Sequence, residues 1–192
     1  MSKSDIVVTL FTIIYGLMLT DLFSSFHRLI SEKTKVKWHW LPLLASWYLF
    51  LTVLKNWWSL VFVNDNLNWL NIIFFIAYGH LLLLIFLAVS ITLPDKVGKN
   101  EMDLKTYYFQ NHTYFWGLMT TIIFTTLLIS VLKGINTGTA LNLPQILGSG
   151  LFIIITVLLA ISKKMWVHST LLVFIVLVNI FEITMKALPT AN

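Results

Sequence analysis

The sequence contains no cysteine, and only 11% of its 192 residues are charged. The absence of cysteine excludes disulfides, zinc–thiolate sites, iron–sulfur clusters and thiol redox chemistry. Soluble domains carry about 25% charged residues, so this chain has too few charges to cover a surface that faces water on all sides. With 58% hydrophobic residues and a mean hydropathy of +0.84, the composition suits a surface that faces lipid.

The motifs of common enzyme classes are also missing. The sequence has no H-E-x-x-H, no G-x-S-x-G and no phosphate-binding loop, which leans against an enzyme without excluding one. The sequence has no stripe of basic residues interleaved with aromatic ones, so nothing in it indicates nucleic-acid binding. The net charge of +5 instead indicates contact with anionic lipid headgroups or a bias of cytoplasmic loops.

Long apolar runs dominate what remains. A membrane span needs about 20 mostly apolar residues, and six stretches meet this length, at 5–30, 38–63, 67–93, 105–133, 143–162 and 167–188. The runs are continuous, without the alternation of polar and apolar residues that barrel strands require. We therefore predict an all-α polytopic membrane bundle of six transmembrane helices, forming a single domain over 1–192. The short link at Lys163-Lys164 predicts that the last two helices form an antiparallel hairpin.

The distribution of basic residues predicts the orientation of the bundle. If the N-terminus is outside, nine of the Lys and Arg residues fall on the inner side and four on the outer side. The positive-inside rule then places both termini outside, which in a bacterium is the periplasm. The segment 94–106 is the longest link and is expected to be a solvated inner loop.

Ionisable residues inside a membrane are costly, so each one is a candidate functional residue. The candidates are Asp21, Arg28, Lys55, His80, His112 and Glu182. Their alternative role is to hold the bundle together through static pairs. Lys55 and Glu182 have similar predicted depths, so we expect them to pair, unless Glu182 pairs with Lys186 one turn later. Asp21 and Arg28 are two turns apart and within reach of each other.

Histidines gather near the predicted inner interface, at His27, His39, His112 and His168. With Asp21 nearby, these imidazoles are candidates for a metal, haem or pH-sensing site, and His80 is a further candidate haem ligand. Interfacial histidines also serve as simple amphipathic anchors. The sequence requires no cofactor.

Two helices carry small and polar residues at helical spacing. In the first they are Thr9, Thr12, Gly16, Thr20, Ser24 and His27, and in the fourth they include Gly117, Thr121 and Thr125. Such stripes are typical of faces that pack closely against other helices or line a wet path. They favour a homo-oligomer.

Several segments together suggest a relationship. These are 15–20, 27–30, 57–60, and Leu93-Pro94-Asp95 followed by 103–108. On these segments the chain resembles a family of small bacterial inner-membrane proteins with no assigned function, over roughly its first two thirds. The resemblance implies a bacterial inner-membrane location and no particular activity, substrate or catalytic residue.

The leading functional hypothesis is passage of a small solute or ion, as a transporter or channel. One alternative is a membrane haem or redox protein that uses the intramembrane histidines. Another is a non-catalytic membrane subunit or effector of a signalling or defence system.

Overall fold

The computed structural model describes residues 3–63, 72–96, 101–138 and 143–187, and these residues fold almost entirely as helices. Side chains 3, 4, 62, 63, 136, 137, 186 and 187 are not among those described. The helices are α1 (Lys3–Ser31), α2 (Trp40–Trp58), α3 (Ile72–Thr92), α4 (Leu104–Thr137), α5 (Leu143–Ile161) and α6 (Met165–Ala187). A short 3-10 turn covers Lys33–Lys35, a π-helical turn (Ser59–Val63) extends α2, and two-residue strands lie at β1 (Val36–Lys37) and β2 (Met102–Asp103).

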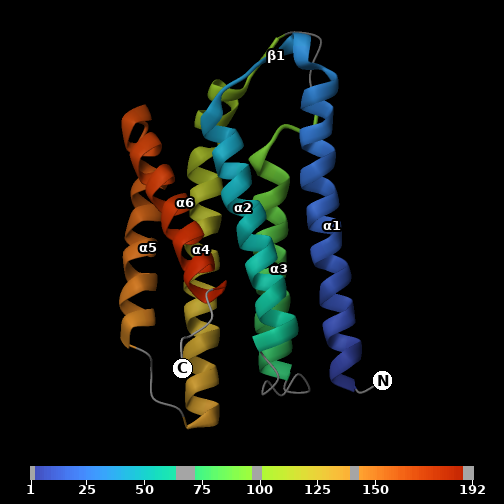
Figure 1. The fold of residues 1–192 in the computed structure, drawn as a ribbon, viewed down its shortest axis with the longest axis vertical. Helices are drawn as coiled ribbons and strands as arrows, with labels where there is room; N and C mark the ends of the chain where they lie inside the picture. The colour runs from blue at the N-terminus through green and yellow to red at the C-terminus, as the bar shows by residue number, and fades with distance from the viewer. Residues whose placement is uncertain (1–2, 64–71, 97–100, 139–142, 188–192) are drawn as a thin grey trace.

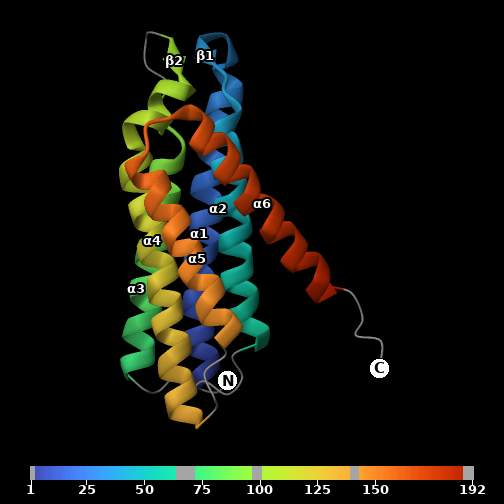
Figure 2. The ribbon, with the colours of Figure 1, turned by 90° about the vertical axis from the view of Figure 1, so that its left-hand side faces the viewer.

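The helices run roughly parallel to one long axis, with the two strands at one end (Figure 1). Helices α1 to α4 pack against one another, and α5 lies along α4. The start of α1 and the end of α6 both point toward the end opposite the strands (Figures 1 and 2). The start of the first helix and the end of the sixth are expected on the same side when consecutive helices run antiparallel.

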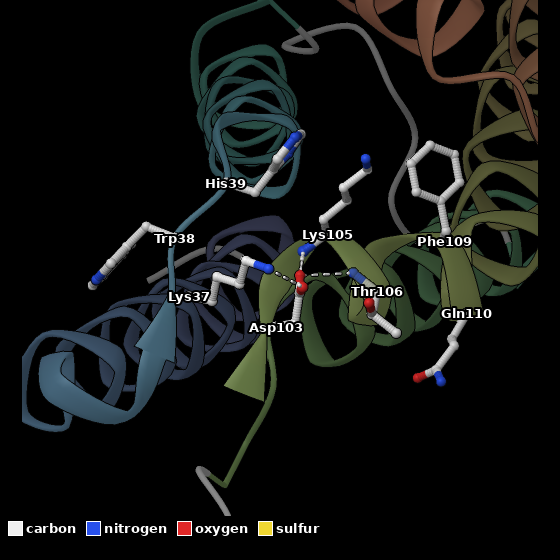
Figure 3. Close-up of a pocket in the computed structure, with 8 residues that line it drawn as sticks. All are labelled: Lys37, Trp38, His39, Asp103, Lys105, Thr106, Phe109 and Gln110. Carbon is white, nitrogen blue, oxygen red and sulfur yellow. Dashed lines mark hydrogen bonds and ion pairs between the residues drawn. The ribbon is translucent and has the colours of Figure 1, made fainter. Parts of the chain in front are cut away.

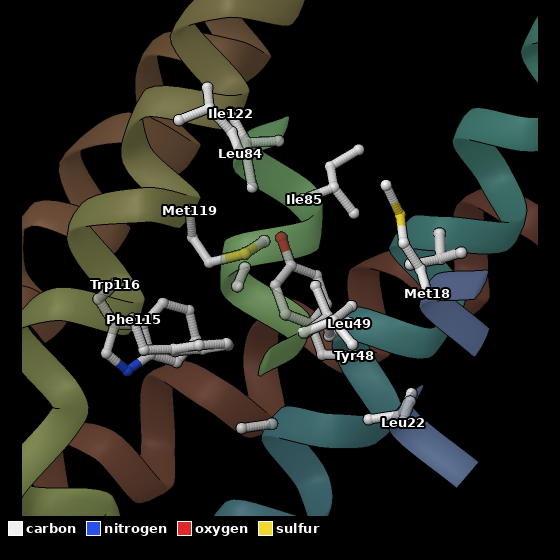
Figure 4. Packing of buried hydrophobic residues seen from close by; sticks show 14 of the residues in the cluster. Met18, Leu22, Tyr48, Leu49, Leu84, Ile85, Phe115, Trp116, Met119 and Ile122 are labelled. Atoms are coloured by element: carbon white, nitrogen blue, oxygen red, sulfur yellow. The ribbon is translucent and has the colours of Figure 1, made fainter. Parts of the chain in front are cut away.

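The core of the bundle is formed by large apolar side chains from all four of its central helices. Met18, Leu49, Ile85, Trp116 and Met119 are each fully buried and meet between the helices (Figure 4). Outward-facing side chains are equally apolar: Ile72, Ile73, Ile76, Leu83 and Phe86 of α3 are all 40% or more exposed. A soluble monomer rarely exposes so much apolar surface, whereas a lipid-facing helix does so throughout its length.

Five helices are long and apolar enough to cross a membrane. They are 5–31, 72–92, 104–135, 143–161 and 165–185. The all-α membrane prediction is confirmed at this level. The helix α2 is not among the five, because Lys55, Asn56 and several tryptophans reduce its hydropathy, so the count of six spans is not established. The predicted polar turn at 64–66 lies outside the described residues.

The hairpin prediction for the last two helices holds for their connection but not for their packing. α5 and α6 are joined by a three-residue link. From that link α6 diverges from α5 and leans away from the bundle (Figure 2), and its main contact is with α2.

The two short strands have no signal in the sequence. β1 pairs in parallel with β2, so that Val36 lies opposite Met102 and Lys37 opposite Asp103. Part of the segment 94–106, expected to be a solvated loop, is therefore tied to the link between α1 and α2. Asp103 also caps α4, since its Oδ1 accepts hydrogen bonds from the amides of Lys105 (2.8 Å) and Thr106 (3.1 Å).

The cap on α4 should depend on pH. The Thr106 amide foremost, then the Lys105 amide and the Lys37 ammonium, lower the pKa of Asp103 below its ordinary value of 3.8, against an opposing desolvation. Stabilisation by a carboxylate with a lowered pKa is complete above its unfolded pKa and lost as pH falls through the folded pKa. We expect amide protection at Lys105 and Thr106, measured by hydrogen exchange in micelles, to fall below about pH 3.8.

The matched variants for this test are Asp103→Asn and Glu101→Gln. Asp103→Asn should remove the pH dependence because an amide does not titrate in this range. Glu101 is an exposed neighbour, so Glu101→Gln should behave as the unmodified protein. An unchanged pH profile in Asp103→Asn would contradict the assignment.

Candidate functional site

An ion pair joins α2 to α6 inside the helical region. The Nζ of Lys55 donates to Oε2 of Glu182 at 2.5 Å and to Oδ1 of Asn179 at 3.0 Å. The predicted pairing of Lys55 with Glu182 is confirmed. The alternative partner, Lys186, has a side chain outside those described.

Asn179 orients this pair. Its side chain is buried, and its Nδ2 donates to the carbonyl oxygen of Ile175 at 3.0 Å, which turns Oδ1 toward Lys55. Asn179 and Glu182 are three residues apart and therefore share a face of α6. The spacing of Asn179 and Glu182 is visible in the sequence, but Asn179 is uncharged and so is not among the predicted candidates.

A large cavity with both polar and apolar walls, which we call the α6 cavity, lies beside the pair. It has a volume of about 820 Å³ and is partly open. Its walls come from α2, α4, α5, α6 and the π-helical turn. Its polar lining residues are Tyr48, Thr52, Lys55, Asn56, Ser59, Thr126, Gln145, Ser149, Asn179 and Glu182, and its apolar ones include Met119, Ile122, Phe152, Phe181 and Met185.

The divergence of α6 from α5 explains why a cavity exists here. Near their link the two helices are close, and toward the far end they separate (Figure 2). Gly148 and Ser149 of α5 line the cavity, and a Cβ atom added at Gly148 would meet nothing within 4 Å. The side chains of Lys55 and Glu182 are 32% and 43% exposed. The ion pair therefore borders the cavity and is accessible from it.

The π-helical turn Ser59–Val63 follows Lys55 closely and contributes Ser59 to the cavity wall. A π-turn widens the helix and breaks the regular hydrogen-bond ladder, and such turns are frequent at functional sites. No sequence pattern indicates this turn.

The expected contact between Asp21 and Arg28 is not formed. Arg28 instead donates from Nη2 to Ser25 Oγ at 2.9 Å and approaches Oδ1 of Asp95 at 3.4 Å. This pair joins α1 to the end of α3, near the strands. Asp21 is half-buried and, among the described residues, makes no hydrogen bond or ion pair.

His80 and most of the small-residue stripe of α1 face away from the bundle. His80 is exposed on α3, and Thr9, Gly16 and Thr20 are exposed on α1. A Cβ atom added at Gly16 would meet nothing within 4 Å. The stripe does not pack against helices of the same chain, so any close packing it provides is with another molecule.

Only two of the four inner-interface histidines come together. The rings of His112 and His168 lie 5.4 Å apart, centroid to centroid, and both are buried. His27 is exposed on α1, and His39 caps α2 by accepting from the Leu41 amide. Within the described ranges, no group of three or more His, Asp or Glu residues could hold a metal ion.

His168 belongs to a chain of hydrogen bonds that joins α4, α6 and the link between α5 and α6. Trp116 Nε1 donates to Tyr108 Oη at 2.9 Å, and that hydroxyl lies 2.9 Å from Nδ1 of His168. Nε2 of His168 lies 2.8 Å from the carbonyl oxygen of Ser162 and therefore carries the proton. Tyr108 then donates to Nδ1, so both ring nitrogens are used. This network joins α4 and α6 to the link that follows α5.

Comparisons with protein-family models, curated proteins and solved structures give no match for this chain. The structure supports a class: an all-α protein with five helices long and apolar enough to cross a membrane, and with a cavity beside an ion pair between α2 and α6. The family resemblance seen in the sequence assigns no role to the residues of that cavity.

Exchanging the two charges of the pair tests its contribution to stability. Lys55→Glu or Glu182→Lys alone would place like charges together, and each should lower the free energy of unfolding by about 1 to 2 kcal/mol, the upper range for polar contacts between membrane helices. The double variant restores opposite charges and should recover most of that loss. Unfolding in mixed micelles followed by circular dichroism measures all three.

The exposed pair of Glu32 and Lys35 provides the control. Reversing Lys35 to Glu should change stability by no more than about 0.5 kcal/mol, since exposed pairs contribute little. If the double variant is only as stable as the summed effects of the two single variants predict, the Lys55–Glu182 contact contributes nothing to stability.

Proposed function

We propose that the protein passes a small polar solute or ion across the membrane through the α6 cavity, with Lys55, Asn179 and Glu182 as its binding groups. The observation that carries the proposal is the accessible ion pair in the cavity wall. Charged groups at membrane depth cost several kcal/mol unless they are paired or wet. If the pair served only to hold helices together, sealing it from water would strengthen the attraction between its charges. Instead, the pair opens onto a cavity of about 820 Å³.

The chemistry of the cavity favours a solute that carries charge. A zwitterion fits best, because its carboxylate can pair with Lys55 while its ammonium pairs with Glu182. Neither protein charge is then left uncompensated when the solute separates them, which avoids the large penalty of an unpaired buried charge. Polar groups such as Ser149 and Gln145 provide additional neutral contacts along the wall.

The arrangement of α6 supports a moving part. In the described chain, hydrogen bonds from Lys55 to Asn179 and Glu182 join α2 to α6. A solute that competes for these groups weakens the tie of α6 to α2. Closure of α6 over the cavity then alternates with the open arrangement, as in transporters that rock one helical unit against another.

The topology we propose has six spans with both termini outside, in the bacterial inner membrane. Helix α2 counts as the sixth span because it packs against α1, α3 and α4 within the bundle. The exposed α1 stripe and His80 support a homo-oligomer, since such groups are costly against lipid. A reporter fused after Asn192 that is active in the cytoplasm would overturn this orientation.

Flux in proteoliposomes tests the proposed function. The probes are a labelled small neutral amino acid, as the zwitterion, and a pH-sensitive dye for proton movement. The protein should raise the flux of at least one probe above that of empty liposomes. Glu182→Gln keeps the shape of the side chain but removes its charge, and it should reduce the flux about tenfold, equivalent to one weakened charged contact.

Glu32→Gln, a change of the same chemistry in the exposed link after α1, should leave the flux unchanged. Equal flux in Glu182→Gln and the unmodified protein would remove the pair from the pathway. Flux no greater than that of empty liposomes for both probes would count against transport.

The other two hypotheses have less support. The haem hypothesis needs free imidazole nitrogens, but both nitrogens of His168 are used by protein partners, and His80 lies on the outer face of α3. A role as a subunit or effector of a signalling or defence system stays a prediction from the sequence.

A further inference from the structure

A second pocket lies at the other end of the molecule, beside the two strands. We call it the basic pocket. It has a volume of about 580 Å³ and is lined by Lys37, Trp38, His39, Asp103, Lys105 and Thr106, with Phe109 and Gln110 at its edge (Figure 3). The residues come from β1, the link between β1 and α2, β2 and the first turns of α4. None of them lines the α6 cavity, so a ligand of the basic pocket is independent of the proposed transport.

The charges of the basic pocket are not balanced. Asp103 is its one carboxylate, and both of its oxygens are committed: Oδ1 caps α4, and Oδ2 lies 3.5 Å from Nζ of Lys37. The ammonium of Lys105 makes no hydrogen bond or ion pair with any residue that the structure describes. The pocket thus carries one uncompensated positive charge, on a side chain that lines it.

Two further donors are available to an anion. The contact between Lys37 and Asp103 is long, and the Lys37 side chain is 73% exposed, so Lys37 can turn toward a new partner at little cost. His39 accepts from the Leu41 amide through Nδ1 at 3.3 Å, which leaves the proton of the neutral ring on Nε2. Desolvation and then repulsion by Lys105 lower the pKa of His39, while Asp103 opposes this.

The surroundings of the pocket have the composition of a membrane interface. Trp38 and Trp40 are 41% and 43% exposed, and tryptophan concentrates at the level of lipid headgroups. The same end of the bundle carries further cations, at Arg28, Lys33, Lys35, Lys96, Lys163 and Lys164. Juxtamembrane cations of this kind attract anionic lipids.

We propose that the basic pocket binds the phosphate group of an anionic lipid, with Lys105 and Lys37 as its charged contacts and His39 as a neutral donor. The pocket opens beside the apolar ring of Phe109 and the indole of Trp38 (Figure 3). These rings provide surface for the glycerol and the first carbons of the acyl chains, while the phosphate stays at headgroup level. An inorganic phosphate offers the same charge but gains nothing from this apolar rim.

Binding can be measured as a lipid-dependent shift of the unfolding temperature in micelles. Phosphatidylglycerol should raise this temperature more than phosphatidylcholine does, because only the first carries net negative charge. The variant Lys37→Gln/Lys105→Gln should lose about thirtyfold in affinity for phosphatidylglycerol, which corresponds to about 2 kcal/mol at 1.4 kcal/mol per factor of ten. Raised salt should weaken the shift in the unmodified protein.

The matched control is Lys163→Gln/Lys164→Gln, which removes the same charge at the same end but outside the pocket. It should keep at least half of the shift. An equal loss in both double variants would mean that the lipid responds to overall charge, and the pocket assignment would be wrong. The conservative variant Lys37→Arg/Lys105→Arg retains both charges and should retain binding, which separates loss of the site from loss of the fold.

Glycerol phosphate and inorganic phosphate, added without lipid, separate the two sources of the phosphate group. A much smaller shift with either one supports a lipid ligand. A shift equal to that of phosphatidylglycerol at the same concentration would overturn the lipid assignment. Loss of the shift in the arginine variant, with helical content unchanged, would also contradict it.

Discussion

A bilayer cannot solvate charge, and this constraint organises the whole molecule. Most ionised groups lie near the two ends of the helices, where water reaches them. Asp21 of α1 is one exception in the described chain, and the pair of Lys55 and Glu182 is another, in which Nζ and Oε2 lie 2.5 Å apart. The constraint also explains why the outer surface is as apolar as the core, since lipid replaces water around α3 and its neighbours. Polar groups left in the helical region are therefore informative, and several of them, including Lys55, Asn179 and Glu182, line the α6 cavity.

The two ends of the helical assembly are held together in different ways. Near the strands, Tyr108, Trp116 and His168 join α4 and α6 through hydrogen bonds with well-defined donors. At the other end α6 separates from α5, and its polar tie is to α2 through Asn179 and Glu182. Helix α6 is therefore held near its start by the hydrogen bonds of His168 and is separated from α5 toward its end. Such an arrangement fits a helix that opens and closes a cavity.

The helices and one of their contacts are predictable from the sequence, and the remaining contacts are not. Apolar length gives the position of each helix to within a few residues, and similar depth pairs Lys55 with Glu182 correctly. The depth of a residue along its helix does not indicate which side of the helix it lies on. Because α3 is apolar on every side, nothing in its sequence indicates that His80 faces outward. Arg28 approaches Asp95 at 3.4 Å rather than Asp21, which lies two full turns away along α1. The π-turn after Lys55 and the divergence of α6 arise from packing between helices, which leaves no local pattern.

The pairing of β1 with β2 has a consequence for how the chain is assembled in the membrane. Parallel strands need a long crossover connection, and here that crossover contains two whole helices, α2 and α3. β1 leaves the ribosome early and has no partner until both helices have been inserted and have turned back to the same side. The strand pair therefore forms only in chains whose first helices have the correct orientation. Its formation is therefore a late step, which joins the link between α1 and α2 to the segment that precedes α4.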